Sequence, residues 1–369
     1  MRNAKILVFS TWLLALPATV EPQAATRHTV TLDGKAAQVV FDLGGGSLTK
    51  FHFQDMPLSP LNWGEVGDPL APRPMGHFIC FDRWGPPSES ERRNGMFSHG
   101  EASRVNWNLI RPPEEKAGII EAEMEAALPM AGLTIRRRIA LGKDQAVLRV
   151  WESVTNMNKL GRVYNLVQHA TIGPPFLDET TQVDANARKG FMQSSPLPNP
   201  EEPPVFWPQA LKDGQPVNLR RLIDDPLPSV VSFTIDQHYG WATAGTGAKG
   251  LMIGYVWKTE DYPWFSVWRS VRDGKPVARG LEFGTTGLHQ PFPILVEKGR
   301  IFGRPIVMYL DAGQTVTRSY TAFLFKIRET FQGVDSVILD GRRLIVRQRG
   351  TGSQRDLVMD AGSLLPEAE

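Results

Sequence analysis

The chain lacks disulfide potential, an excess of charge of either sign and the spacing motifs of metal or nucleotide sites. Its 369 residues include one cysteine, Cys80, which cannot form an internal disulfide, so we expect its thiol to be buried. Lys and Arg number 41 against 39 Asp and Glu, a net charge of +2. A balance this even does not attract nucleic acid. We therefore expect no nucleic-acid partner.

Metal-binding and phosphate-binding motifs are also missing. The seven histidines are scattered, and neither H-x-x-x-H nor paired cysteines occur. His77 with Asp82 and His289 near Glu282 are the only combinations that could begin a metal site, and ordinary loop residues are the simpler interpretation. The triple glycine at 44–46 is not followed by Lys-Ser/Thr, so we interpret it as a strand bend. We expect no metal and no cofactor.

The first 25 residues have the pattern of an export signal. Arg2 and Lys5 precede an apolar stretch at 6–16, and small residues follow at Ala18, Ala24 and Ala25. The apolar stretch is short for a membrane span, although an uncleaved N-terminal anchor is the alternative. We expect a cleaved signal peptide at 1–25, no stable membrane insertion afterwards, and a periplasmic or secreted protein.

After the signal, apolar and polar residues alternate in short runs. Such runs occupy 28–32, 37–41, 119–128, 133–141 and 146–154, and similar ones recur from 230 to 346. Period-two alternation broken by Gly, Pro, Asn and Asp predicts strands and turns. With 41% apolar residues, the chain can bury a large core. We predict an all-β protein, a single large sandwich domain at 26–352 followed by a polar, frayed tail at 353–369.

Residues suited to a ligand site gather at predicted strand ends and in loops. An apolar run delivers His169 to a Gly-Pro-Pro turn, and the loop-rich stretch 58–107 contains His99 and Arg104. Aromatic rings pack on the C–H faces of sugars, while Arg and carboxylates bind hydroxyls. Trp264 and Trp268 are therefore candidate contacts for a small-molecule sugar or oligosaccharide.

One reaction needs only a histidine and a glutamate. To open a cyclic hemiacetal, a base takes the proton of the anomeric O1 and an acid protonates the ring oxygen, without a metal or nucleotide. His169 and Glu282 could do this at neutral pH if burial raised the pKa of the glutamate. We expect the two side chains to face one cleft, about a pyranose ring apart.

Three stretches, in order along the chain, resemble motifs of the galactose mutarotase-like superfamily, the aldose 1-epimerases and their relatives. His99 followed by Arg104 is similar to the family's His-Gly-Phe-Ala-Arg loop. The segment around His169 is similar to one with an Asn-His-Thr-Tyr-Phe or His-Pro-Tyr-Phe motif, which precedes a strand ending near an acidic residue, here Asp184. The run Gly-Leu-Glu-Phe places Glu282 where the family has its base glutamate.

The resemblance implies a β-supersandwich that acts on sugars as an aldose 1-epimerase, with His169 as acid and Glu282 as base. It also implies that His99 and Arg104 bind substrate hydroxyls, and we include Asp184 among the substrate-binding candidates. Two alternatives stay open. One is a non-catalytic carbohydrate-binding protein of the same fold. The other is a polysaccharide-processing enzyme, which needs a second carboxylate beside Glu282. The candidates for that second carboxylate are Asp178, Asp184 and Asp261.

Overall fold

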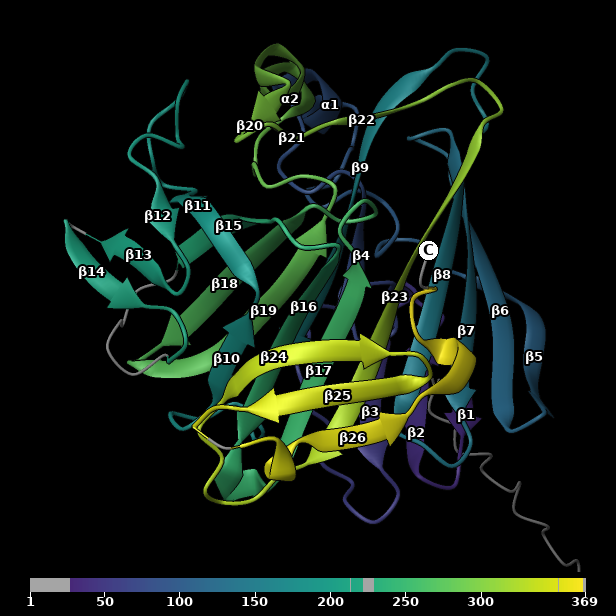
Figure 1. Cartoon of the computed structure of the whole chain (residues 1–369). Coiled ribbons are helices and arrows are strands. Elements are labelled where there is room, and N and C mark those ends of the chain that lie inside the picture. Colours follow the sequence, from purple (N-terminus) through teal and green to yellow (C-terminus); the bar gives the residue numbers. More distant parts are fainter. Residues whose placement is uncertain (1–26, 213, 222–228, 351, 368–369) are drawn as a thin grey trace, which may run out of the picture.

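A computed structural model describes residues 27–212, 214–221, 229–350 and 352–367. The predicted export signal lies outside the described residues. Two large antiparallel sheets stack on each other (Figure 1), which confirms the all-β prediction. Within the described residues, no helix is long and apolar enough to cross a membrane.

The larger sheet has eleven strands and carries the candidate site at its centre. In sheet order its strands are β1 (Thr29–Asp33), β2 (Ala37–Asp42), β3 (Leu48–Phe53), β4 (His77–Asp82), β9 (Arg162–Ile172), β19 (Lys275–Gly284), β18 (Trp264–Arg272), β15 (Ser229–Ile235), β11 (Ala187–Met192) and β12 (Val205–Phe206), with β22 (Met308–Leu310) paired to the start of β9. The central trio β4, β9 and β19 therefore joins segments that lie far apart in sequence.

The second sheet has eight strands and covers one face of the first. In sheet order they are β10 (Gln182–Ala185), β16 (Tyr239–Thr246), β17 (Leu251–Lys258), β23 (Thr315–Lys326), β8 (Val147–Asn156), β7 (Leu133–Gly142), β6 (Ile119–Leu128) and β5 (Asn108–Lys116). Strand β6 buries every second residue, as expected for a strand with one face on the core and one toward solvent. The main apolar cluster lies between the two sheets.

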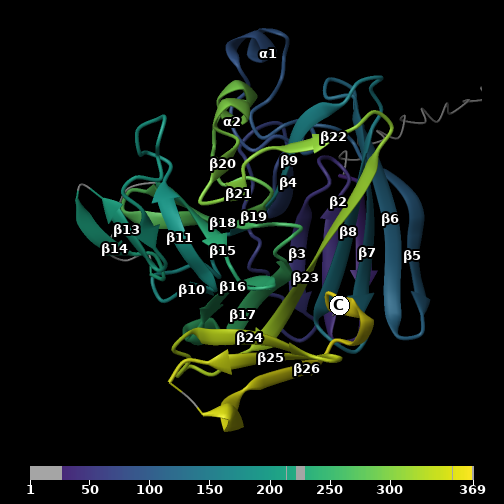
Figure 2. The ribbon, with the colours of Figure 1, turned by 45° about the horizontal axis from the view of Figure 1, so that its top comes forward.

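Short elements decorate the sandwich. They are the helices α1 (Glu89–Arg93) and α2 (Phe292–Lys298), the hairpins β13 (Gln209–Lys212) with β14 (Gln215–Asn218) and β20 (Arg300–Ile301) with β21 (Arg304–Pro305), and the 3-10 turns Gly247–Lys249, Ser353–Arg355 and Gly362–Leu364. The hairpin of β13 and β14 lies next to the edge of the large sheet that ends in β11 and β12 (Figure 2). Both helices lie at the end of the sandwich near β9 (Figure 1).

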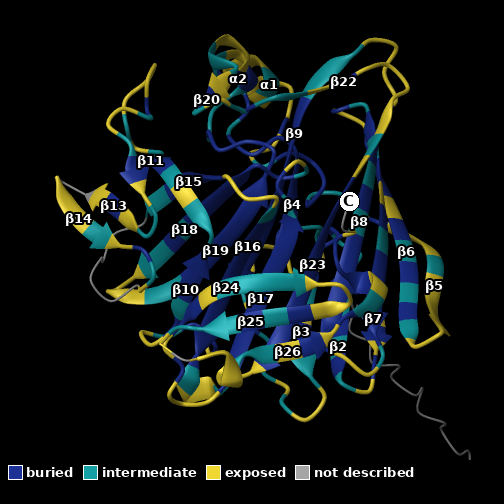
Figure 3. Ribbon diagram, viewed as in Figure 1, coloured by how far each residue is buried: buried dark blue, intermediate teal, exposed yellow. Residues whose placement is uncertain are grey.

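The central strands of the large sheet are buried on both faces. In β9 every residue from Tyr164 to Ile172 is buried, and most of β19 is buried as well (Figure 3). One face packs on the second sheet. Loops that carry α1 and α2 lie toward the other face, where α2 residues such as Leu295 join a small apolar cluster with Trp264. The candidate residues thus lie under a layer of loops.

The C-terminal region forms a third sheet instead of a frayed tail. Strands β24 (Val334–Asp340), β25 (Arg343–Gln348) and β26 (Leu357–Asp360) cross over the eight-stranded sheet (Figure 1). Beyond them, Leu364 and Leu365 are only 3% and 5% exposed. The predicted polar tail at 353–369 is therefore wrong over most of its length, because β26 pairs with β25 and the leucines after it join the main core.

Candidate active site

His169 and Glu282 are direct neighbours across the ladder between β9 and β19. Their side chains lie on the face turned away from the second sheet, because Gln168 and Ala170, on either side of His169, point into the core between the sheets. Nε2 of His169 lies 3.3 Å from Oε1 of Glu282. The residues are 6% and 1% exposed, respectively. The sheet itself therefore holds the predicted pair in contact.

This contact differs from the expected spacing. We predicted a gap about as wide as a pyranose ring between the reacting atoms, and 3.3 Å leaves no room for a ring. Adjacent strands lie about 4.8 Å apart, so two cross-strand side chains on one face approach each other directly. A sugar can therefore meet the pair only from above the sheet and cannot bind between its members.

Each member of the pair also makes a hydrogen bond to another side chain. The indole Nε1–H of Trp84, in the loop after β4, donates to Oε2 of Glu282 at 2.7 Å. Nδ1 of His169 lies 2.8 Å from the hydroxyl of Thr171, two residues along the same strand. The His169 ring also stacks on Phe78 of β4, with ring centroids 4.2 Å apart. Both side chains are thus fixed in orientation.

Aromatic side chains form the surroundings of the pair. The ring of Trp268 lies 5.5 Å from that of His169 and 6.0 Å from that of Trp63, which meets it edge-on. Trp63 and Trp268 are both partly exposed, in contrast to the buried pair. The ring centroid of His99 lies 5.8 Å from that of His169 and 5.4 Å from that of His289. Partly exposed indoles beside a buried acid–base pair suit the face of a sugar ring.

Burial keeps the pair uncharged. It raises the pKa of Glu282 to about 8, although the hydrogen bond from Trp84 acts in the opposite direction. Burial also lowers the pKa of His169 well below its usual 6.5, and the nearby His99 adds to this effect. At neutral pH the carboxyl group therefore carries a proton and the imidazole is neutral. The site offers one carboxyl O–H and one unprotonated imidazole nitrogen at contact distance.

His99 lies beside His169, with ring centroids 5.8 Å apart, and Arg104 is held by an acidic side chain. Nδ1 of His99 lies 3.4 Å from Sγ of Cys80, which is fully buried as expected. Burial lowers the pKa of His99 to about 3, and the charge of Arg104 contributes. Arg104 itself forms an ion pair with Glu65 at 2.5 Å. The structure thus places His99 next to the pair, while Glu65 compensates the charge of Arg104.

Trp264 is a structural residue. It is completely buried, donates from Nε1 to the carbonyl of Pro305 at 2.7 Å, and packs edge-on against Phe191. It shares a face of β18 with Trp268, but the α2 cluster covers it. Of the two predicted tryptophans, only Trp268 is available to a ligand.

Asp184 is also a structural residue, and the structure does not bring it to the site. It lies on β10, an edge strand of the second sheet, and is 1% exposed. Oδ1 accepts hydrogen bonds from Arg220 at 2.7 Å and Arg349 at 2.8 Å, and Oδ2 accepts one from the backbone N–H of Val334 at 2.8 Å. Its carboxylate therefore connects β10 to the C-terminal sheet.

Sequence reasoning missed several residues of the site. They are Trp63, Phe78 and Trp84. His289, which the sequence suggested only as a metal ligand near Glu282, is a ring neighbour of Trp84, with centroids 5.0 Å apart. Trp63, Phe78 and Trp84 belong to the stretch 58–107, whose loops and aromatic residues are the sequence feature that indicated a ligand site. Nothing in the local sequence indicates which of its aromatic residues meets Glu282.

The combinations considered for a metal serve other purposes. His77 points into the core, where Nε2 lies 3.1 Å from Oε1 of Gln168, and Asp82 forms ion pairs with Arg83 and Arg162. Among the residues that the structure describes, no group of three or more His, Cys, Asp or Glu side chains could hold a metal ion.

No protein-family model and no curated protein sequence matches the chain. Solved structures do match. The Slr1438 protein of Synechocystis sp. PCC 6803 has a TM-score of 0.59 at 14% identity, over 84% of this chain and 99% of that one. A galactose mutarotase related enzyme from Lactobacillus acidophilus has a TM-score of 0.56 at 12% identity, over 85% and 100%.

A third match is a protein from Klebsiella pneumoniae with a provisional assignment as an aldose 1-epimerase, with a TM-score of 0.56 at 15% identity over 80% of this chain and 78% of that one. Identities this low establish the fold alone. The two stacked sheets and their match over most of the chain confirm the resemblance at that level: the protein has the galactose mutarotase-like β-sandwich fold.

Proposed function

We propose that the protein is an exported carbohydrate-active enzyme that interconverts the anomers of an aldose in the manner of an aldose 1-epimerase. The observation that carries this proposal is the uncharged, buried pair of His169 and Glu282 in contact at 3.3 Å beneath partly exposed tryptophans. Fold similarity to a galactose mutarotase related enzyme supports the same reaction class.

Ring opening requires two proton transfers, one at each of the two oxygens that are bonded to C1. The O1 hydroxyl gives its proton to Nε2 of His169, and Glu282 gives the proton of Oε1 to the ring oxygen as the bond from C1 to that oxygen breaks. Both sugar oxygens are bonded to C1, so two groups 3.3 Å apart can reach them together. The products are the open-chain aldehyde, an imidazolium and a carboxylate.

Ring closure reverses the transfers. After rotation about the bond from C1 to C2, Glu282 takes the proton of the former ring oxygen as this oxygen attacks the other face of the carbonyl. His169 returns its proton to O1, and the pair regains its starting state. In this half of the cycle His169 is the acid and Glu282 the base, the roles that the family resemblance implies. Each residue serves in both roles.

The direct test is anomeric equilibration, followed by NMR after a pure anomer is dissolved, across a panel of aldoses. We expect acceleration by the wild type on at least one sugar, and a loss of about 10²–10⁴-fold in Glu282→Gln and in His169→Gln. Equal rates for the wild type and Glu282→Gln on every sugar would reject catalysis by this pair.

The low exposure of the pair, 6% and 1%, favours one alternative, a sugar-binding protein without turnover. A bound sugar raises the melting temperature according to its concentration and affinity. Stabilisation by a sugar that persists when both His169 and Glu282 are replaced, together with unaccelerated equilibration, would support this alternative.

We also propose that residues 1–25 direct export and are removed. N-terminal sequencing of protein from the periplasmic and culture fractions should show a start near residue 26. Recovery of chains that begin at Met1 in the membrane fraction would indicate an uncleaved anchor instead.

A further inference from the structure

We propose that Trp84 is a positioning residue for Glu282. Its indole N–H engages Oε2, so that Oε1 is the oxygen that holds the exchangeable proton and faces His169. This inference rests on the function proposed above for the two residues, but it concerns a contact that can be tested without any sugar.

The two oxygens of the Glu282 carboxyl group have different neighbours. Oε2 of Glu282 accepts from Nε1 of Trp84 at 2.7 Å, and Oε1 lies 3.3 Å from Nε2 of His169. The indole nitrogen of Trp84 can only donate a hydrogen bond. A proton on Oε2 that pointed toward this nitrogen would meet the indole N–H hydrogen and repel it. The carboxyl proton therefore belongs on Oε1, the oxygen next to the imidazole.

Packing leaves the indole little freedom. Trp84 is 3% exposed and belongs to a small apolar cluster with Phe78, Cys80 and Val167. The next residue, Gly85, lies so close to the neighbouring loop that a Cβ atom there would be 2.9 Å from the backbone nitrogen of Gln290. The loop that carries Trp84 is thus pressed against a second loop of the site.

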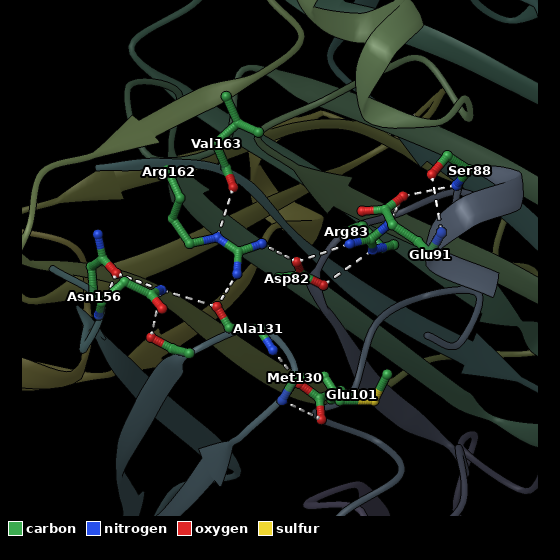
Figure 4. A network of polar contacts seen from close by, with 12 residues as sticks. Asp82, Arg83, Ser88, Glu91, Glu101, Met130, Ala131, Asn156, Arg162 and Val163 are labelled. Carbon is green, nitrogen blue, oxygen red and sulfur yellow. Dashed lines mark hydrogen bonds and ion pairs between the residues drawn. The ribbon is translucent and has the colours of Figure 1, made fainter. Parts of the chain in front are cut away.

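A chain of charged residues holds this loop on both sides of the tryptophan (Figure 4). Arg83 lies 3.2 Å from Asp82 and 2.8 Å from Glu91 of α1, and it is 4% exposed. Asp82, which is completely buried, also pairs with Arg162 at the start of β9. Ser88 and Glu91 form a capping box at the start of α1. The chain therefore links α1 to the strand that carries His169.

The far end of the same loop has its own attachment (Figure 4). The carboxylate of Glu101 accepts hydrogen bonds from the backbone N–H groups of Met130 at 3.2 Å and Ala131 at 2.8 Å, in the turn between β6 and β7. Arg162 donates to the carbonyl of Ala131. Both ends of the segment from Asp82 to Glu101 are thus fixed to the sandwich, which suits a segment that orients one indole.

The test compares Trp84→Phe with the wild type by the NMR titration of Glu282, observed through 13C-labelled glutamate carboxyl groups and assigned by its disappearance in Glu282→Gln. Phenylalanine keeps an aromatic ring and removes the N–H. A hydrogen bond to a charged group stabilises the ionised carboxylate, so its loss should raise the pKa of Glu282 by about one pH unit or more. An unchanged titration in a folded variant would overturn the proposal.

Trp207→Phe is the matched control. Nε1 of Trp207 has no hydrogen-bond partner among the described residues, so the same substitution there should leave the titration of Glu282 unchanged. The charged residues that hold the Trp84 loop, Asp82, Arg83, Glu91 and Arg162, are tested in the same way. Arg83→Met should change the pKa of Glu282, whereas Arg92→Met, at an exposed position of α1, should not. Equal shifts of the Glu282 pKa in Arg83→Met and Arg92→Met would show that the ion pairs of Arg83 play no part in positioning Glu282.

Activity provides the second readout. In a variant with a shifted carboxyl pKa, the alkaline limb of the pH profile for anomeric equilibration should move by the same amount. If the wild type does not accelerate the anomeric equilibration of any sugar, the proposed function is rejected, but the titration of Glu282 still decides the role of Trp84. A shifted titration without turnover would therefore support the positioning of Glu282 and reject only the enzyme.

Discussion

Oε1 of Glu282 lies 3.3 Å from Nε2 of His169, and the two residues are paired directly across neighbouring strands of the large sheet. A charged pair at this depth would have to overcome a desolvation cost of several kcal/mol per ion. Neutral partners avoid that cost and keep one transferable proton between them. The protonation state of this pair can be measured and governs the first two predictions.

The activity should fall at alkaline pH. Ring opening begins with a proton on Glu282, whose pKa burial raises to about 8. We expect the rate of anomeric equilibration under kcat/KM conditions to be flat between about pH 6 and 7 and to fall about tenfold per pH unit well above 8. A decline on the acid side centred near pH 6.5 would contradict the buried, neutral state of His169.

The same carboxyl group should also make the stability of the fold fall as the pH becomes alkaline. The folded pKa of Glu282 lies above its usual value of 4.5, so between about pH 4.5 and 8 the folded state binds more protons than the unfolded state. The resulting stabilisation is complete below pH 4.5 and is lost as pH rises through 8. Relative to Glu282→Gln, the wild type should lose about 1.4 kcal/mol per pH unit in this window, measured by urea unfolding. Parallel stability curves for the two proteins would rule this out.

Asp184→Asn should weaken the fold and spare the site. The substitution leaves Arg220 and Arg349 without their buried carboxylate, so we expect a loss of about 3–5 kcal/mol in the free energy of unfolding. Asp335→Asn, which removes a more exposed partner of Arg349, should cost less than about 1 kcal/mol. A lower sugar affinity with unchanged stability in Asp184→Asn would restore the sequence-based role in substrate binding.

Trp268 and Trp264 should respond in opposite ways to truncation. Trp268→Ala removes a partly exposed ring beside His169 and should weaken sugar binding by about tenfold, with little change in melting temperature. Trp264→Ala empties a buried site in the α2 cluster and should cost about 3–5 kcal/mol of stability. Calorimetric titration with sugar and thermal unfolding of both variants would separate the two roles, and a similar pattern in both would contradict the assignment.

Local periodicity predicted most of the strands. The runs expected at 119–128 and 133–141 match β6 and β7 closely, because alternation over ten residues leaves one way to bury an apolar face. The C-terminal tail was missed because β26 is only four residues long. Its pairing with β25 is a tertiary contact that a short apolar run in a polar stretch does not reveal.

The site could be predicted in part, for a related reason. His169 and Glu282 were recognisable from their residue types and order, but their direct contact depends on the register between β9 and β19. Alternation shows which residues share a face of a strand, but it does not show which sheet the strand joins, so Asp184 was misplaced. Trp84 reaches Glu282 from 198 positions away, a distance over which local sequence carries no signal.

The only sulfhydryl group of the chain has a practical value. Cys80 is fully buried, and its Sγ lies 3.4 Å from His99 inside the aromatic surroundings of the pair. Burial raises the pKa of this thiol well above 9, so it reacts with an alkylating reagent only when the overlying loops open and admit solvent. Because no other cysteine competes, the rate at which Cys80 is alkylated therefore measures how often the loops over the site open. A bound sugar that keeps these loops closed should lower this rate.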